Sequence, residues 1–224
     1  MRKIVKGKEP TSLTEHRATL HTNYDNYPGK ETLREFLIKE QRGICCYCLS
    51  RIPTKLGKMK IEHWHSQANF PIEQLDYSNM LGACMGNEGQ PGSDQHCDTY
   101  KGEKNLTLNP ANPLHSIEDR IHFLSDGKIS SPDATIDAEL NAVLNLNVAH
   151  LKNNRKAVLD SFKKFLGKRK LLSQSQWGNL LREWNGESST GDLRPFCQVI
   201  VYWIRKRLAG YGSSVSSSPN VPQS

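Results

Sequence analysis

The sequence predicts an α+β chain that is mostly α, in which a turn-rich module packs on a helical C-terminal half. Residues 44–104 contain few large apolar side chains and many glycines and prolines, which excludes long elements there. Beyond Asp133 the apolar residues instead recur at helical spacing. Five of the six cysteines lie between Cys45 and Cys97. A segment with so little apolar surface needs another source of stability, and a bound metal ion is the usual one.

The N-terminal part is expected to contain one long helix and one short strand. Residues 1–28 are polar and aperiodic, so we expect an extended arm. Residues 30–42 show helical spacing, and Gly43 follows as a C-cap. Residues 58–64 alternate as in a short strand, and residues 76–83 are expected to begin a short helix.

The C-terminal half is expected to begin with a hairpin and continue as helices. Residues 120–129 surround an Asp-Gly pair that favours a hairpin turn. Pro195 is suited to be the first residue of a last helix that runs to Leu208. That helix is apolar on most sides, so it either caps the core or presents a face to another subunit. The Gly/Ser/Pro-rich residues 210–224 are expected to be disordered.

These patterns divide the chain into four regions. We expect an N-terminal arm (1–28), a cysteine-containing module (29–107), a hairpin with a helical domain (108–209) and a disordered tail (210–224).

The composition is that of a soluble globular protein, with 36% hydrophobic and 24% charged residues. No apolar run approaches the roughly 18 to 20 residues that span a bilayer, and the N-terminus lacks the apolar segment of a secretory signal. We therefore expect a cytoplasmic protein with no membrane partner. In a reducing cytoplasm, cysteines serve as metal ligands, reactive thiols or core residues more often than as disulfides.

The cysteine spacing indicates a structural zinc site. One tight turn can present Cys45 and Cys48 to a tetrahedral ion, and Cys84 and Cys97 would close the site. Four thiolates leave zinc no open position, so such a site is structural. His96 is a rival fourth ligand, and the cysteines can alternatively be unrelated core residues. We assign the remaining Cys46 and Cys197 to packing.

The cysteines would hold together three polar segments that suit phosphodiester hydrolysis. This reaction needs a base to deprotonate a water and a cation to neutralise charge on the phosphate. His63 can be the base, because an imidazole is partly neutral near pH 7. Glu62 and Asp98 can offer oxygen ligands to Mg²⁺. Asn79 can orient the imidazole, by a hydrogen bond or a tight turn.

The strand geometry leaves the role of Glu62 open. Regular alternation puts His63 and His65 on one face of the strand and Glu62 on the other. Both Glu62 and His63 line one site only if the backbone departs from regular geometry near the end of the strand. Otherwise Glu62 loses its role, and His65 becomes a substrate or metal contact instead of a bystander.

The order of these motifs resembles the HNH nuclease motif: C-x-x-C, an acid-His pair on a strand, LDYSN, a cysteine and CDxxKG. The resemblance implies a ββα-metal fold for the module, with two strands and a helix around one metal. In that family the first histidine is the general base and the middle asparagine supports it, which correspond to His63 and Asn79. Glu62 and Asp98 correspond to the metal ligands, and Lys101 is placed to touch phosphate.

More narrowly, IEHW, LDYSNMLGAC, QHCDTYKG and the later LNLN-x-x-x-L-x-x-x-R resemble the HNH subunit of Septu-type antiphage systems, which also occurs beside retrons. The resemblance implies an ABC or SMC-like ATPase partner and, for retrons, a reverse transcriptase with its RNA-DNA. Two features depart from the pattern. The third HNH position is Asp98 instead of Asn or His, which leaves His96 as a rival, and an insertion separates Cys84 from Cys97.

The net charge of +7 is concentrated in residues 149–170. A cationic helix face there would bind a DNA or RNA backbone without sequence preference, although it can also be merely solvated. We expect phosphate contacts from Lys101, Lys152, Arg155, Lys156, Lys163 and Lys164. The rival function is a non-catalytic zinc-knuckle subunit that binds nucleic acid or a partner. It explains the cysteines and the basic helix but not the Glu62, His63, Asn79 and Asp98 pattern.

Overall fold

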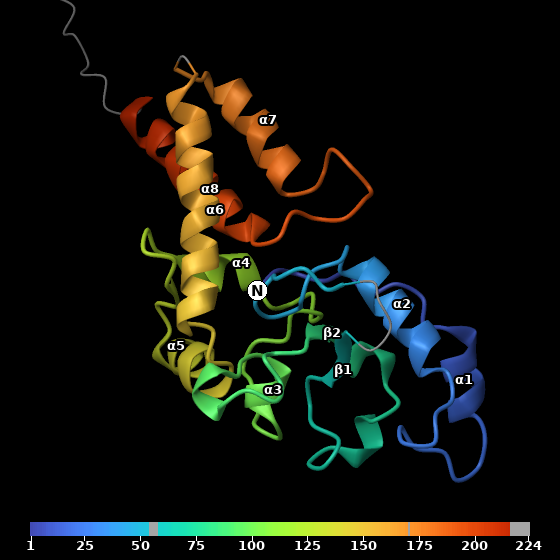
Figure 1. The fold of residues 1–224 in the computed structure, drawn as a ribbon. Coiled ribbons are helices and arrows are strands. Elements are labelled where there is room, and N and C mark those ends of the chain that lie inside the picture. The colour runs from blue at the N-terminus through green and yellow to red at the C-terminus, as the bar shows by residue number, and fades with distance from the viewer. Residues whose placement is uncertain (54–57, 170, 216–224) are drawn as a thin grey trace, which may run out of the picture.

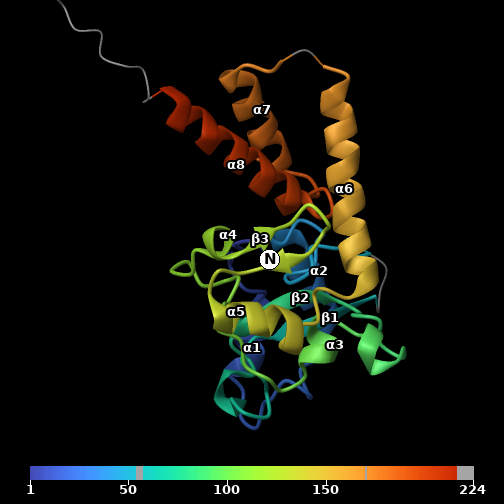
Figure 2. The ribbon, with the colours of Figure 1, turned by 90° about the vertical axis from the view of Figure 1, so that its left-hand side faces the viewer.

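The computed structural model describes residues 1–53, 58–169 and 171–215, without the side chains of 211–215 (Figure 1). The chain is α+β, as expected, with two small antiparallel sheets and a larger helical content. Figures 1 and 2 show the longest helices at one end of the molecule and the first sheet, with the N-terminal helices, at the other. Among the described residues, no helix combines the length and apolar content that crossing a bilayer requires.

The first sheet pairs β1 (Met59–His63) with β2 (Met80–Cys84), and α2 (Lys30–Glu40) packs on it. Directly after α2, the amide of Gln41 donates to the carbonyl of Gly82 (2.7 Å) and accepts from its N–H (2.6 Å). A Cβ at position 82 would lie 3.1 Å from Met59 Cε and 3.2 Å from Gln41 Nε2. A larger residue would therefore require the Met59 or Gln41 side chain to shift by a few tenths of an ångström.

The expected extended arm is wrong for part of the N-terminal segment. Residues Thr11–Arg17 form helix α1, and Met1, Ile4, Leu13 and Tyr27 are buried in the core. These apolar residues are too widely spaced to produce a helical or strand period. Tertiary burial, which local spacing does not report, orders the segment.

The expected helix over residues 76–83 is wrong as well. A single 3₁₀ turn, η2 (Tyr77–Asn79), leads directly into β2. The Asp76 carboxylate caps that turn by accepting from the Ser78 N–H at 2.8 Å. Pairing with β1 then supplies backbone partners that a short isolated helix could not.

The second half follows the expected order of a hairpin and then helices. The short helix α4 (Ile117–Arg120) precedes the hairpin of β3 (His122–Phe123) and β4 (Ile129–Ser130). The helices that follow are α5 (Ala134–Ala138), the π-helix η4 (Glu139–Val143), α6 (Ala149–Gly167), α7 (Gln174–Trp184) and α8 (Cys197–Val215). The remaining short elements are η1 (Pro71–Glu73), η3 (Gly92–Asp94) and α3 (Asp98–Lys101).

Helix α8 caps the core. It is also longer than expected, so the prediction of a disordered tail is wrong for residues 210–215. Its Val199, Ile200 and Ile204 are buried, and the Trp203 ring lies 5.8 Å from the Trp177 ring of α7. The helix begins at Cys197 and continues to Val215, so residues 210–215 are helical and not disordered. Residues 216–224 lie outside the described chain.

Candidate functional site

The four predicted cysteines meet in one cluster. The Sγ atoms of Cys45, Cys48, Cys84 and Cys97 all lie within 4.8 Å of one another. Two of the separations are 3.8 Å (Cys45–Cys97) and 3.7 Å (Cys48–Cys84). Sulfurs bound at about 2.3 Å in a tetrahedron around zinc lie about 3.8 Å apart. The cluster therefore fits a tetrahedral metal ion, and the four buried thiols can bind one.

His96 and Cys46 lie next to the four-cysteine cluster but are not among its four ligand candidates. The imidazole Nδ1 of His96 lies 3.1 Å from Cys97 Sγ, and the ring packs 4.9 Å from that of His150. Burial works against a thiolate at Cys48, but hydrogen bonds from Cys84 and Cys97 lower its pKa to about 6. Burial raises the pKa of Cys46 well above its ordinary value, so this thiol keeps its proton as a core residue.

The Glu62 carboxyl is buried near the cysteine cluster, with a side chain only 2% exposed, and it binds Tyr47, which lies between Cys45 and Cys48. Its Oε1 accepts from the Tyr47 hydroxyl at 2.7 Å and lies 2.9 Å from Lys101 Nζ. Burial, followed by the nearby Asp98 carboxyl, raises the pKa of Glu62 well above its ordinary value. Two carboxyl groups therefore face one another where a cation would relieve their repulsion.

Asp98 is the more exposed member of this carboxyl pair. It opens helix α3 directly after Cys97, whose backbone adopts a φ of 56°. Its Oδ2 lies 3.7 Å from Lys60 Nζ, and its side chain is 21% exposed. Glu62 and Asp98 thus come together from β1 and α3. His96 lies instead beside the cysteine cluster, so the structure brings Asp98 to Glu62.

The His63 imidazole is held by groups that the sequence did not reveal. Its Nε2 lies 3.0 Å from the Gln74 carbonyl, and the Tyr24 ring meets it edge-on at 4.5 Å. A carbonyl only accepts, so the Nε2–H donates, and a neutral ring carries its lone pair on Nδ1. Burial lowers the pKa of His63, while the Gln74 hydrogen bond and the Asp98 charge oppose the shift. The ring is therefore neutral near pH 7.

The geometry at the end of β1 bears on whether Glu62 and His63 can line one site. The strand stays in register through His63, which pairs with Met80, and Glu62 pairs with Leu81. Both Glu62 and His63 are nevertheless buried. The Asp98 carboxyl acts electrostatically on both side chains, since it opposes the lowering of the His63 pKa and raises that of Glu62. The two side chains share a carboxyl neighbour although the strand remains regular.

Asn79 fixes the chain after His63 and does not contact the imidazole. Its Oδ1 accepts from the His65 N–H at 2.8 Å, and its Nδ2 donates to the His65 carbonyl at 2.9 Å. The His65 ring pairs with Glu73 at 2.7 Å and stacks on Phe70 at 4.1 Å. These partners give His65 a packing role.

Two of the expected phosphate contacts are buried. Lys101 is 1% exposed, and its Nζ also donates to the His63 carbonyl at 3.1 Å. Arg155 is 1% exposed and donates to the carbonyls of Gly127 (2.6 Å) and Leu146 (2.7 Å). The helical pattern could not distinguish Arg155 from the surface cations, because only tertiary contacts place it inside. The sequence predicted both side chains at the surface, and the structure buries both.

The other expected contacts lie nearer the surface. Lys156, Lys163 and Lys164 are exposed, and Lys152 is partly exposed. Lys156 pairs with Asp160 one turn later. The basic face of α6 is therefore smaller than the sequence suggested, with Lys163 and Lys164 making no ion pair among the described residues.

Comparison of the sequence with known proteins finds a distant relative. No family model matches the chain. A curated Escherichia coli protein named "Retron Ec83 putative HNH endonuclease" is 27% identical over 191 aligned residues, which cover 68% of this chain and 73% of the relative. This chain is similar to an HNH endonuclease. The similarity supports a nuclease that acts on nucleic acid, and the carboxyl pair beside a neutral histidine is chemically suited to that activity.

Proposed function

We propose that this chain is a metal-dependent HNH endonuclease that hydrolyses nucleic-acid phosphodiester bonds. The observation that carries the proposal is that Lys101 contacts both the Glu62 carboxyl (2.9 Å) and the His63 carbonyl (3.1 Å), while Asp98 on the same short helix directly follows Cys97 of the cysteine cluster and acts on both side chains. In this assignment the cysteines hold a structural Zn²⁺, and Glu62 and Asp98 hold Mg²⁺ or another divalent cation.

The chemistry of the carboxyl pair fits a divalent cation. Tyr47 and Lys101 both bind Oε1 of Glu62, and the Asp98 carboxyl lies close enough to the Glu62 carboxyl to raise its pKa. Asp98 supplies a second, partly exposed carboxyl. When bound, the cation supplies charge neutralisation at the phosphate and the leaving oxygen.

His63 is the proposed general base. The hydrogen bond to the Gln74 carbonyl fixes the proton on Nε2, so Nδ1 takes the proton of the attacking water. Asn79 positions the ring indirectly, by clamping the backbone of His65. Lys101 holds the Glu62 carboxylate and the His63 carbonyl in place, so we assign it to positioning and not to phosphate binding.

The biological setting of the proposal comes from the resemblance to Septu-type and retron-associated HNH subunits. We place the chain in the cytoplasm as the effector of an antiphage complex with an ABC or SMC-like ATPase, and in retrons with a reverse transcriptase and its RNA-DNA. DNA is the proposed substrate and RNA the alternative. The named relative, a retron protein, supports this setting.

One observation favours a second function, a non-catalytic zinc-knuckle subunit that binds nucleic acid or a partner. Glu62 already has two donors on Oε1, and one of them is a buried ammonium. A carboxylate neutralised in this way can serve the fold alone.

Cleavage assays separate the two functions. Supercoiled plasmid and a structured RNA are incubated with Mg²⁺, with and without the ATPase, using wild type, His63→Ala and His65→Ala as the matched control. We expect cleavage by wild type and His65→Ala and a loss of at least a hundredfold in His63→Ala. Equal cutting by wild type and His63→Ala would refute the His63 assignment. No cutting by wild type under any condition would favour the binding subunit.

A further inference from the structure

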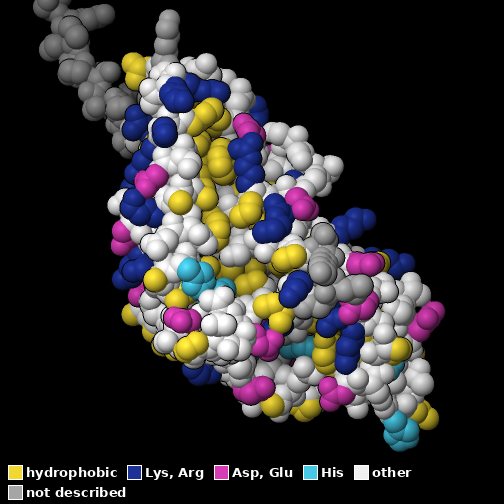
Figure 3. All heavy atoms as spheres, viewed as in Figure 1, with side chains coloured by type: hydrophobic (Ala, Val, Ile, Leu, Met, Phe, Trp, Pro, Cys, Tyr) yellow, Lys and Arg dark blue, Asp and Glu magenta, His cyan; other side chains and the backbone are white. Residues whose placement is uncertain are grey.

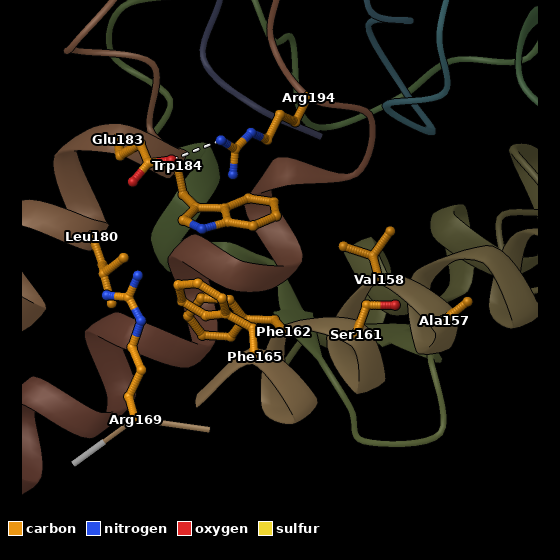
Figure 4. Close-up of a pocket in the computed structure, with 10 residues that line it drawn as sticks. All are labelled: Ala157, Val158, Ser161, Phe162, Phe165, Arg169, Leu180, Glu183, Trp184 and Arg194. Carbon is orange, nitrogen blue, oxygen red and sulfur yellow. Dashed lines mark hydrogen bonds and ion pairs between the residues drawn. The ribbon is translucent and has the colours of Figure 1, made fainter. Parts of the chain in front are cut away.

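A groove runs between helices α6 and α7, far along the chain from the carboxyl pair. One hollow of this groove has a volume of about 530 Å³, and its floor is apolar. Figure 4 shows Phe162 and Phe165 on one side and Trp184 on the other. The small residues Ala157 and Ser161 keep the α6 side open.

The groove continues toward the cysteine module. A second hollow of about 610 Å³ shares Ala157, Val158 and Trp184 with the first and reaches Arg51, which lies three residues after Cys48. Lining positions on α6 therefore run from residue 154 to residue 165. At roughly 1.5 Å per residue this is about 16 Å, the length of three helical turns.

The helical arrangement explains why the groove is open. Both α6 and α7 pack on α8, where the Trp203 ring lies 5.8 Å from Phe162 and 5.8 Å from Trp177. Between α6 and α7 themselves, Phe162 and Trp184 meet edge-to-face at 5.5 Å and form the floor. Figure 1 shows α6 and α7 close together at the end where the chain connects them and farther apart toward the C-terminus of α7. A further helix laid in the groove would complete a four-helix arrangement.

The charged residues that line the first hollow are Arg169, Arg194 and Glu183, so the rim carries a net positive charge. The Arg169 guanidinium lies 4.1 Å over the Phe165 ring, with no carboxylate partner among the described residues. The Arg194 guanidinium lies 4.6 Å over Trp184 and pairs with Glu183 at 2.7 Å. Figure 3 shows the band of hydrophobic side chains flanked by Lys and Arg.

Three other occupants fit the groove less well. Bases would need open aromatic faces, but guanidinium groups cover Phe165 and Trp184. A second copy placed symmetrically would set two basic rims against each other. The chain's own residues 216–224, SSSPNVPQS, include one aliphatic residue besides two prolines, which is too little apolar surface to fill the groove.

We propose that the α6–α7 groove binds an amphipathic helix of a partner protein, apolar along positions i, i+4 and i+7 and acidic on both flanks. The apolar side chains fill the space above Phe162, and the flanking carboxylates meet Arg169 and Arg194. The inference goes beyond the proposed nuclease function and does not depend on it, because no residue of the groove belongs to the carboxyl pair or the cysteine cluster.

The test uses a displayed library of 16-residue peptides built on an alanine-rich helical frame and selected against the full chain. Selected peptides are labelled, and their binding is measured by fluorescence anisotropy. The variants are Ser161→Glu, which puts a negative charge inside the groove, and Arg169→Glu, which reverses the rim charge. Asn153→Glu makes the same charge change as Ser161→Glu at an exposed α6 position outside the groove. Circular dichroism checks that all variants fold.

We expect enriched peptides with an apolar stripe and flanking Asp or Glu, bound equally by wild type and Asn153→Glu. Ser161→Glu is expected to weaken binding at least tenfold and Arg169→Glu at least fivefold. The proposal is overturned if no peptide is enriched, if the enriched peptides are basic, or if all variants bind alike. It is also overturned if Ser161→Glu alone abolishes binding of a labelled single-stranded oligonucleotide, or abolishes a dimer seen by sedimentation, while peptide binding is unchanged.

Discussion

The ammonium of Lys101 lies 2.9 Å from the Glu62 carboxylate, and both side chains are almost completely buried. Lys101 belongs to α3 and Glu62 to β1, so this ion pair joins the two elements that carry the carboxyl pair. Its position also explains why a lysine near the expected phosphate site does not face solvent. The stability of the site is expected to depend on this ion pair and on the cysteine cluster beside it.

Removing the cation of this pair should destabilise the fold. In Lys101→Met, the buried Glu62 carboxyl loses the ammonium that favours its charged form, so it either stays charged without a partner or takes up a proton. Losing one partner of a buried ion pair typically costs about 3–5 kcal/mol, and the free energy of unfolding, measured by urea denaturation at pH 7.5, is expected to fall by that order. Adding Glu62→Gln replaces the carboxyl with a neutral amide, so the double variant should recover part of the loss. A double variant that is as unstable as the sum of the single variants would contradict the pairing.

The His63 imidazole should make folding stability depend on pH. Burial lowers its pKa in the folded protein, so between that value and the unfolded value near 6.5 the unfolded chain binds more protons. The free energy of unfolding therefore rises with pH through this window, and the stabilising effect of high pH is lost as pH falls below about 6.5. Without added metal, the slope should be shallower in His63→Gln than in wild type. Identical slopes would show that His63 is not buried as described.

The four-cysteine cluster should account for all tightly bound zinc. Cys84→Ser removes one of the four thiols that lie within 4.8 Å, whereas Cys46→Ala changes a neighbouring thiol outside the cluster. Plasma emission spectrometry of purified protein should find one zinc per chain in wild type and Cys46→Ala, and well under half of that in Cys84→Ser. Full zinc content in Cys84→Ser would refute the four-thiol site.

Arg155 should contribute to stability and not to nucleic-acid affinity. Arg155→Met leaves the carbonyls of Gly127 and Leu146 without their donors inside the protein. Each unsatisfied group costs about 1–3 kcal/mol, so a loss of about 2–6 kcal/mol in unfolding free energy is expected for the two carbonyls. The control Lys164→Met, at an exposed position of the same helix, should change stability by less than about 0.5 kcal/mol. Comparable losses in both variants would contradict this assignment.

Binding to phosphates should instead come from the exposed lysines of α6. The double variant Lys163→Glu, Lys164→Glu should weaken binding of a labelled duplex for every sequence tested. The slope of log Kd against the logarithm of the salt concentration should also fall by about one for each phosphate that the protein no longer neutralises. Lys39→Glu, an exposed lysine on α2, supplies a control with the same change of charge per residue. An unchanged salt dependence in the double variant would show that this face is only solvated.

The local patterns of the sequence predicted much of the fold. The helices of the C-terminal half, the 122–130 hairpin and strand β1 have periods or turn residues that act within a few positions of the chain. The cysteine cluster was predictable for a related reason. The turn between Cys45 and Cys48 is local, and the chemistry of four thiols restricts what Cys84 and Cys97 can do.

Contacts between distant residues were not predictable in the same way. Tyr47, Gln74 and Tyr24 hold Glu62 and His63, yet none of them has a distinctive spacing from these residues. Tyr47 lies between Cys45 and Cys48, and this is the one signal that could have connected it with the site. The helix α1 was missed because its few apolar anchors are buried by distant elements.

By itself the sequence determined the α+β class and the four-cysteine cluster, and it selected Glu62, His63, Asn79 and Asp98 as candidates whose functional roles stay predictions. These follow from short-range periodicity and from side-chain chemistry, which the chain carries wherever it folds. Only the tertiary structure decided which charges are buried and what they contact. In the sequence, Lys101 and Arg155 cannot be told from exposed lysines and arginines. In the structure both are buried, where Lys101 pairs with Glu62 and Arg155 donates to backbone carbonyls in the core. Burial depends on elements far apart in the chain, and no local pattern encodes it.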